Sequence, residues 1–551
     1  MRLVDAINGH DSGVEVPAPN EVPSKFVLEC LTTENERDGM LFAALLENKL
    51  LYAAANESWY VWRGNFWQRD RTELVLGLVR YVTDRYGQEI VDLEGKINKS
   101  KQENDDEDHK IYTKGWNRKI ELLQKKIKAL RQEKGRNACV KFARTYFDNP
   151  FATEGNEFDK DPWLLGVRNG VVDLRSGELY PGEPQQLVSK RCSCGFVPLD
   201  QVLDRGAWEQ FLDDIFDGDQ EIIEFMQILL GYGITGLTTE HVFPFLLGRG
   251  RNGKSLFIGA ICRVLGDYAA TVPCEIFLKS NQPRTANQTD PAIMKHEGLR
   301  IAMSSEVEEG ARFSSQQVKR ITGGDNLEGR NPYDKELREF KPTHLSLMIG
   351  NHEPVPPTGD PAFWDRTFLI NFPIRFVKAN PDPEKHEKLA DSDIEDKLTG
   401  MDEQILAWLI EGCLKWQAAG RKIVPPQSVL KSTGEYRDDA DWIGQFVSAC
   451  CSKSESETGS TTLYTAFILW YRETINPRKD STPSHRAFGL KMKACDSFQY
   501  IRRSEGVVYR GVVLNQTWQR RLMDEAVGPP APELRPAVAD VASFRRDPPP
   551  R

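Results

Sequence analysis

The spacing of apolar residues changes several times along this chain, and each change predicts a different element. Residues 42–52 repeat apolar side chains at helical spacing, which predicts a helix. Residues 59–67 are aromatic-rich around Arg63-Gly64-Asn65, which predicts a β-hairpin. Its aromatic side chains either fill a small core or stack on nucleic-acid bases, and the pattern fits both.

A charged stretch, residues 92–134, contains a narrow apolar seam. Its apolar residues alternate between three- and four-residue spacing, at Ile120, Leu123, Ile127 and Leu130. That spacing predicts a helical hairpin or a short coiled coil, with a solvated loop near residues 104–109. Basic residues flank the seam, at Lys125, Lys126, Lys128 and Arg131. They form either a solvated helix face or a surface that contacts DNA.

The middle of the chain alternates strands and helices, which predicts an α/β fold. Short strands are expected at 171–174 and 178–180, and two helices over 208–236. Apolar runs that predict buried strands follow at 242–247, 299–306, 344–351 and 367–372. Between them we expect a helix beginning near Ser314 and a β-hairpin within 326–340.

The last third of the chain predicts a second folded unit. Residues 391–418 are helical in pattern, and residues 442–514 read as helices followed by a hairpin, which is typical of a winged helix. Residues 484–495 would be its recognition helix, with Arg486 and Lys491 facing DNA. A structural winged helix that packs between subunits is the alternative.

These patterns predict seven segments. They are a disordered start (1–23), an α+β region (24–160), a small β module (161–204), the α/β core (205–385), a helical linker (386–430), a winged helix (431–520) and a disordered tail (521–551).

Composition excludes several classes of protein. No apolar run is long enough to span a membrane, and the first residues lack the apolar core of a signal peptide. The ten cysteines do not show paired zinc-ligand spacing, so we expect reduced, buried thiols and a cytoplasmic location. The net charge of −9 gives no global signature of nucleic-acid binding, although a ring-shaped motor needs positive charge only in its pore.

The clearest chemical signal is the segment that joins the 242–247 strand to an apolar helix. Gly248, four residues, and then Gly253-Lys254-Ser255 fit a phosphate-binding loop. Glycines let the backbone wrap a phosphate, and the helix N-terminus favours an anion. The sequence therefore predicts nucleoside triphosphate binding by Gly248, Arg251, Asn252, Gly253, Lys254 and Ser255, with Mg²⁺ on the Ser255 hydroxyl.

Polar residues also follow the later strands. Glu306 ends the 299–306 strand, where a carboxylate binds Mg²⁺ and orients the attacking water, although Glu308 and Glu309 are close enough to take this role. Asn351 ends the 344–351 strand and would hold the γ-phosphate or that water. Lys319 precedes Thr322-Gly-Gly-Asp325, and Arg366 precedes the last strand.

This ordered set resembles the superfamily 3 helicases of viruses, phages and plasmids, above all the phage primase-helicases and the related poxvirus type. The resemblance covers roughly residues 155–385. It implies an AAA+-like P-loop ATPase core, with ATP and Mg²⁺ as cofactors. Glu306 would be the Walker B acid. Many members carry a second acid beside it, but the neighbours of Glu306 in this chain are Ser305 and Val307.

The resemblance also implies an assembly. Asn351 would be the polar sensor, and Arg366 an arginine finger that reaches the ATP of a neighbouring subunit, so the chain would form a ring, usually a hexamer. DNA-facing residues would be Lys319 and a hairpin with Arg330, Lys335 and Arg338, Lys335 at its tip. The implied partners are single-stranded and forked DNA and a separate primase or polymerase, in the bacterial host of a phage, prophage or plasmid.

The region before Trp163 shows no cluster of metal-binding carboxylates beyond the loop at Asp105, so we expect no primer synthesis from this chain alone. Three functions remain: an ATP-driven replicative DNA helicase, a ring ATPase for DNA packaging or loading, and a DNA-binding scaffold assembled by ATP. The Thr322–Asp325 motif and Arg366 favour the helicase over the packaging motor. The complete set of Lys254, Glu306 and Arg366 disfavours the scaffold.

Overall fold

The structure, a computed structural model, describes residues 16–527 with short gaps. The gaps are 32–34, 104–105, 147–149, 202–203, 280–289, 305, 307–310, 331, 333–336, 358–359, 476–481, 494, 496–497 and 505. Lys335, Asp105, Glu308, Glu309 and most of the two ends predicted to be disordered therefore lie outside the described residues. The chain divides into two compact units, Met1–Thr433 and Gly434–Arg551.

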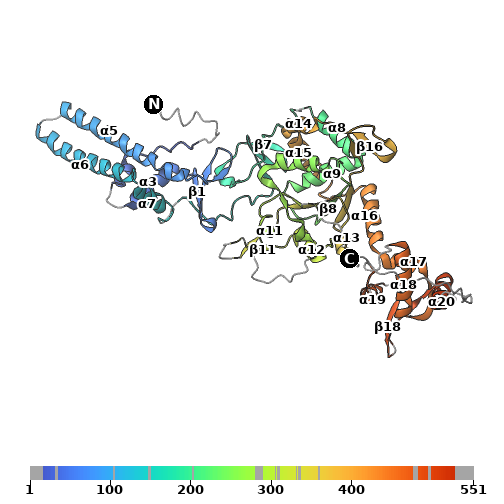
Figure 1. Cartoon of the computed structure of the whole chain (residues 1–551). Helices are drawn as coiled ribbons and strands as arrows, with labels where there is room; N and C mark the ends of the chain where they lie inside the picture. Colours follow the sequence, from blue (N-terminus) through green and yellow to red (C-terminus); the bar gives the residue numbers. More distant parts are fainter. Residues whose placement is uncertain are drawn as a thin grey trace, which may run out of the picture. The chain divides into compact units, whose positions relative to one another are not determined.

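The first unit begins with a helical and sheet-containing region that has its own apolar core, with Phe42, Val61 and Leu123 among its fully buried side chains. The predicted helical hairpin is confirmed, since the long helices α5 (Arg80–Glu103) and α6 (Asp106–Leu130) lie side by side (Figure 1). The loop predicted near 104–109 is wrong for residues 106–109, which belong to α6. The predicted hairpin within 59–67 is confirmed as β2 and β3, joined through Gly64 at φ 84°. The elements are α2 (Ser24–Glu29), α3 (Asn35–Leu46), β1 (Leu50–Ala53), β2 (Ser58–Trp62), β3 (Trp67–Arg69), α4 (Leu74–Gly77), α5 (Arg80–Glu103), α6 (Asp106–Leu130), α7 (Glu133–Ala143) and β4 (Ala152–Thr153).

The prediction of one helix over 42–52 is wrong. Helix α3 ends at Leu46, Asn48 turns the chain in the left-handed region at φ 61°, and Leu50–Ala53 pairs with β2. The apolar run suits a buried strand as well as a helix, and the strand partner decided between them. Disorder over 1–23 is wrong for its last residues as well, because the Asn20 amide donates to the Leu45 carbonyl at 2.7 Å.

The predicted β module is confirmed as a three-stranded antiparallel sheet in the order β5-β6-β7. It consists of β5 (Leu164–Val167), β6 (Gly170–Asp173) and β7 (Glu178–Tyr180), of which the sequence predicted the last two. Buried side chains on β5 and β6, such as Leu165 and Val172, belong to the same core as the α/β region. The module is therefore packed on the α/β region.

The α/β region is built on a five-stranded sheet in the order β14-β8-β13-β10-β9, with every neighbouring pair parallel. The strands are β8 (Phe243–Leu247), β9 (Ala269–Val272), β10 (Ile301–Ser304), β13 (Leu345–Gly350) and β14 (Thr367–Asn371). They are mostly apolar, as expected for parallel strands covered on both faces. The first strand in the chain, β8, lies between the fourth and the fifth, so the carboxyl ends of β8 and β13 flank the switch point where ligands bind in such sheets.

Helices and shorter strands complete this region. They are α8 (Gly206–Ile215), α9 (Gln220–Gly233), α10 (Lys254–Leu265), α11 (Pro291–Met294), α12 (Ser315–Thr322), β11 (Leu327–Gly329), β12 (Arg338–Phe340), α13 (Pro361–Trp364), β15 (Arg375–Val377), β16 (Glu387–Leu389), α14 (Ile394–Thr399) and α15 (Asp402–Ala418). The boundary between the two units falls within α16 (Gln427–Ala440). Strands β11 and β12 pair antiparallel, which confirms the predicted 326–340 hairpin.

Two glycines and one tryptophan determine how the helices of this region pack. A Cβ at Gly231 of α9 would collide with the backbone at Cys413, and one at Gly412 of α15 would collide with the Gln227 carbonyl, so only glycine allows these helices to approach so closely. The fully buried Trp208 of α8 stacks on Phe257 of α10, with ring centroids 5.8 Å apart. Since α10 follows the glycine-rich loop directly, this packing positions the loop.

The second unit combines helices with a three-stranded antiparallel sheet in the order β17-β19-β18. Its elements are α17 (Trp442–Cys450), β17 (Cys451–Gly459), α18 (Ser460–Thr474), α19 (His485–Lys493), β18 (Gln499–Arg503), β19 (Gly506–Leu514) and α20 (Gln516–Val527). Strand β17 is polar and was not predicted. The predicted disorder of 521–551 is wrong for 521–527, which continue α20. No helix in the described part of either unit is long and apolar enough to cross a bilayer.

Two buried histidines make the first unit sensitive to acid. The rings of His296 and His344 lie 4.7 Å apart, and burial lowers the pKa of both, that of His344 well below its usual 6.5. Below pH 6.5 the unfolded chain binds protons that the folded chain does not, so folding stability should fall as pH falls, by up to about 1.4 kcal/mol per pH unit for each histidine, and should not depend on them above pH 7.

Thermal unfolding between pH 5 and 7.5 measures this effect. We expect His344→Leu to flatten the pH dependence of the melting temperature, while His352→Leu, at an exposed histidine, leaves it as in the wild type. Equal slopes for all three proteins would contradict the assignment.

Candidate functional site

The loop between β8 and α10 lies at the switch point of the sheet and is held on both sides. The Gly248 amide donates to the Gly350 carbonyl at 3.2 Å, and the Phe376 amide donates to the Arg251 carbonyl at 2.7 Å. Gly250, Arg251 and Gly253 all have positive φ, at 88°, 52° and 81°. A Cβ at Gly253 would also collide with Ile215 of α8, so glycine is required there for conformation and for space.

Lys254, the first residue of α10, is 2% exposed and points back across the loop. Its Nζ donates to the Gly248 carbonyl at 2.6 Å and to Asn351 Oδ1 at 3.2 Å. Burial lowers the pKa of Lys254 to about 8, and the Glu306 carboxylate opposes that shift. A buried ammonium beside a glycine loop and polar side chains is an arrangement that suits an anion.

Glu306 and Asn351 reach this edge from neighbouring strands. Asn351 follows β13 directly, and Glu306 follows β10 by two residues, with an exposed side chain. The Glu306 carbonyl accepts from Cys274 Sγ at 3.3 Å. Because β8, β13 and β10 are parallel neighbours in the sheet, the structure brings Lys254, Asn351 and Glu306 together at one edge. The order of the strands in the sequence does not by itself ensure this.

The remaining loop residues differ in exposure. Asn252 is 4% exposed, and its Oδ1 accepts from the Lys254 amide at 3.4 Å. Arg251 and Ser255 are exposed, and the Ser255 hydroxyl is on the first turn of α10. Hydroxyl and carboxylate oxygens, such as those of Ser255 and Glu306, are hard donors that suit Mg²⁺.

Arg366 lies at the opposite edge of the sheet. It precedes β14, and its carbonyl accepts from the Phe243 amide at the start of β8. Strand β8 has five residues, so its first and last residues are about 13 Å apart. Arg366 Nε is buried and has no hydrogen-bonding partner among the described residues. Arg366 is therefore separated from the glycine loop of its own chain by the length of β8.

Two of the predicted DNA-facing residues of this unit, Lys319 and Arg338, are engaged in ion pairs. Lys319 Nζ is 2.7 Å from Asp360 Oδ2, and hydrogen bonds from Lys319 and Ser315 lower the pKa of the Asp360 carboxyl. Arg338 is paired with Glu297 at 2.9 Å, and the Arg330 carbonyl accepts from the Asp290 amide. The structure thus gives Lys319 and Arg338 the surface salt bridges that are the ordinary role of such residues.

In the second unit the two residues of the predicted recognition helix differ. Arg486 is exposed near the start of α19. The Lys491 ammonium lies 4.1 Å from the centre of the Trp442 ring, and burial lowers its pKa to about 8. Lys491 therefore packs on its own unit.

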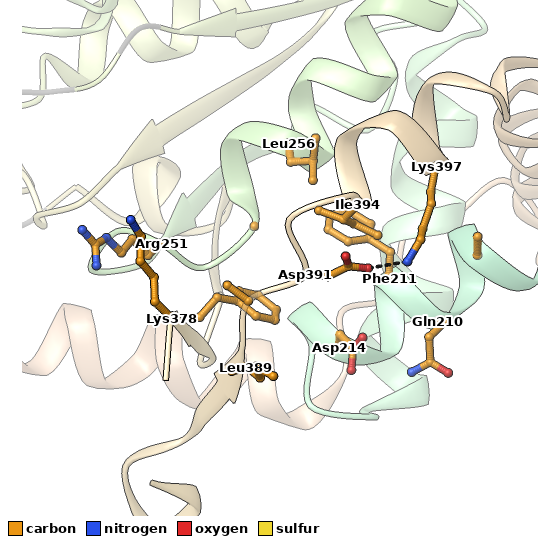
Figure 2. A pocket seen from close by; sticks show the side chains of 14 residues that line it. Gln210, Phe211, Asp214, Arg251, Leu256, Lys378, Leu389, Asp391, Ile394 and Lys397 are labelled. Atoms are coloured by element: carbon orange, nitrogen blue, oxygen red, sulfur yellow. Dashed lines mark hydrogen bonds and ion pairs between the residues drawn. The ribbon is translucent and has the colours of Figure 1, made fainter. Parts of the chain in front are cut away.

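The structure also shows a pocket that sequence patterns did not reveal. A cavity of about 450 Å³ opens beside the glycine loop and is lined by Arg251, Gly253 and Leu256 and by residues of α8, among them Gln210, Phe211 and Asp214 (Figure 2). Its apolar lining is Phe211, Leu256, Phe376, Leu389 and Ile394. Asp391 and Lys397 form an ion pair at 2.7 Å in its wall. The lining comes from three distant segments, and the one sequence signal is the run of apolar residues after β14.

Parts of this chain are similar to known proteins. Residues 39–217 match the family described as D5 N terminal like. A putative helicase of Acanthamoeba polyphaga mimivirus is 26% identical over 416 residues, which are 72% of this chain and 41% of the relative. A putative primase of African swine fever virus is 24% identical over 343 residues, 58% of this chain and 34% of the relative. The chain thus spans less than half the length of these relatives.

Among solved structures, the C-terminal region of NrS-1 matches 85% of this chain and 96% of that chain, with 8% identity and a TM-score of 0.39. The match to the D5 N terminal like family and the viral relatives confirm the predicted resemblance to primase-helicases. The relatives belong to viruses that are not phages, so the comparisons give no support to a bacterial host.

Proposed function

Because the chain contains a D5 N terminal like region of the kind found in primase-helicases, we propose that it is an ATP-driven DNA helicase for replication of a virus or a related mobile element. The observation that carries the proposal is the meeting of Lys254, Asn351 and Glu306 at the switch point of a parallel sheet. It is the arrangement that an AAA+-like P-loop ATPase needs for hydrolysis of a triphosphate.

The residues of the loop define how the nucleotide would bind. Amides from Gly248 to Gly253 would cradle the phosphates at the N-terminus of α10, where the helix dipole favours negative charge. The Lys254 ammonium would exchange the Gly248 carbonyl for the β- and γ-phosphates. The apolar pocket lined by Phe211, Leu256 and Phe376 would take the base, since it opens directly beside the loop.

Hydrolysis would use groups of this chain at the same edge. The Ser255 hydroxyl and the Glu306 carboxylate would hold Mg²⁺, which when bound neutralises charge on the phosphates. Glu306 would orient the attacking water and accept its proton, and the Asn351 amide would hold that water or the γ-phosphate. The hydrogen bond between Asn351 and Lys254 keeps the amide aimed at the loop.

Arg366 supports a shared active site. It lies at the far end of β8 from its own loop, so its guanidinium would serve the triphosphate of a neighbouring subunit and stabilise charge that develops there. Repetition of that contact around an axis closes a ring, for which we propose a hexamer. Single-stranded DNA would pass through it, with Arg330, Lys335 and the second unit, a winged helix with Arg486 on α19, as further DNA contacts.

Unwinding of a forked DNA duplex tests the proposal. We expect the purified chain to separate the strands only with hydrolysable ATP, and single-stranded DNA to increase its ATP turnover several-fold. ATP turnover that single-stranded DNA does not change, with no strand separation, would contradict the helicase proposal and support a packaging motor. Binding of ATP without turnover would support a scaffold.

A further inference from the structure

A basic groove lies in the first unit, apart from the glycine loop. Its volume is about 740 Å³, and its walls come from the β2–β3 hairpin with the residues that follow it, the turn between β5 and β6, the segment after Val188 and the turn after α10. The residues that give it charge are Arg63, Arg69, Arg71, Arg168, Lys190 and Arg191, together with Asp70 and Asp267. Six cations and two carboxylates stand in contrast to a chain whose net charge is −9.

The walls of the groove are firmly connected. The Trp67 amide of β3 donates to the Val188 carbonyl at 2.7 Å, and the Trp67 indole donates to the Pro184 carbonyl at 2.9 Å. The Gly182 amide donates to Asn65 Oδ1 at 3.0 Å, in the turn of the hairpin. Phe66 of the hairpin is buried against Val171 and Val188. The hairpin and the β module therefore form one preorganised surface.

The positive charge of the groove is only partly compensated. Asp70 accepts from the amides of Leu74 and Val75, and Asp267 accepts from the Arg191 amide, so both carboxylates are engaged by backbone. Arg71 and Arg168 are exposed, and neither guanidinium has a hydrogen-bonding or ion-pairing partner among the described residues. On a concave surface, cations such as Arg71 and Arg168 that lack a carboxylate partner attract a polyanion.

The aromatic side chains of the groove are already partly engaged. Tyr60 stacks on Phe158 with ring centroids 4.5 Å apart, so one of its faces is occupied. Phe66 is buried, and the Arg191 guanidinium lies 4.3 Å from the centre of its ring. The groove therefore offers mainly charge to phosphates and little surface for base stacking, which points to binding that is independent of sequence.

We propose that this groove binds the phosphate backbone of single-stranded DNA, as a second contact outside the nucleotide site. Its volume is that of a small-molecule site, so it accepts a few nucleotides of one strand, whereas a duplex would touch only its rim. The choice of DNA over other polyanions rests on the proposed helicase function.

The test is binding of fluorescent single-stranded DNA by the full chain without nucleotide, at several salt concentrations. For Arg71→Gln with Arg168→Gln we expect about 10-fold weaker binding, and a salt slope less negative by about 1.4, since each lost phosphate contact removes about 0.7. The matched control replaces Arg136 and Lys422, two exposed cations outside the groove, by Gln. We expect wild-type binding from the control.

Because no nucleotide is present, this result is separate from the helicase proposal. If the Arg71 and Arg168 variant keeps the wild-type DNA affinity and salt slope, the proposal that the groove binds DNA is overturned, whatever the ATPase activity of the variant. A loss of heparin binding equal to the loss of DNA binding, with no preference for DNA in competition, would show a general polyanion site and would also overturn the proposal.

Discussion

Lys254→Ala should abolish nucleotide binding or turnover, with ATP hydrolysis reduced at least about 100-fold. The ammonium is buried within the loop, so the charge it supplies to a triphosphate is poorly screened by water, and the loss of one such donor costs about 10²- to 10³-fold in rate. Fluorescent ATP-analogue binding and phosphate release measure the two effects separately.

Lys254→Met retains the apolar stem and separates loss of charge from loss of packing. We expect it to match the alanine variant in activity and the wild type in melting temperature. Lys422→Ala, at an exposed lysine, is the control for lost positive charge and should behave as the wild type. If Lys254→Ala hydrolyses ATP at a rate within twofold of the wild type, the glycine loop is not part of the ATPase site.

Arg366→Ala should bind ATP with wild-type affinity and hydrolyse it about 10³-fold more slowly, the effect expected of an arginine finger. The physical reason is its position at the amino end of β14, separated from the loop of the same chain by the length of β8. Arg366→Lys keeps the charge but not the planar fork, so it should restore little activity. Arg375→Ala, at an exposed arginine on β15, is the matched control.

Mixing experiments decide whether the site is shared. Glu306→Gln lacks the carboxylate and Arg366→Ala lacks the guanidinium, so each alone should be inactive. In a mixed assembly, some interfaces combine an intact Glu306 with an intact Arg366, and we expect turnover to return in part. Normal hydrolysis by Arg366→Ala would refute the finger, and no recovery on mixing would refute a site built from two subunits.

The sequence by itself determined the chemical parts of this protein. Gly253 and Lys254 follow a buried apolar run and open a helix, and this local pattern predicts strand, loop and helix without any partner. Asn351 and Glu306 follow strands that apolar runs also predict. The β2–β3 hairpin was predicted from aromatic residues around a glycine, because turn chemistry is encoded within a few residues.

The tertiary structure alone decided which of these parts meet. Periodicity does not encode strand order, so only the fold shows that β13 lies beside β8 and places Asn351 against Lys254, while Arg366 is at the far edge. It also decided the run at 42–52, where pairing with β2 made residues 50–53 a strand.

The fold also set the environment of each charge. Lys319 and Lys491 are alike in sequence as basic residues on helices. Yet Lys319 is paired with Asp360, 41 residues away, and Lys491 lies on Trp442. The basic groove gathers Arg71 and Arg168 from segments whose sequences show no basic cluster. A side chain's charge is local, but its partners and its exposure to water come from distant residues, so they are settled only when the chain folds.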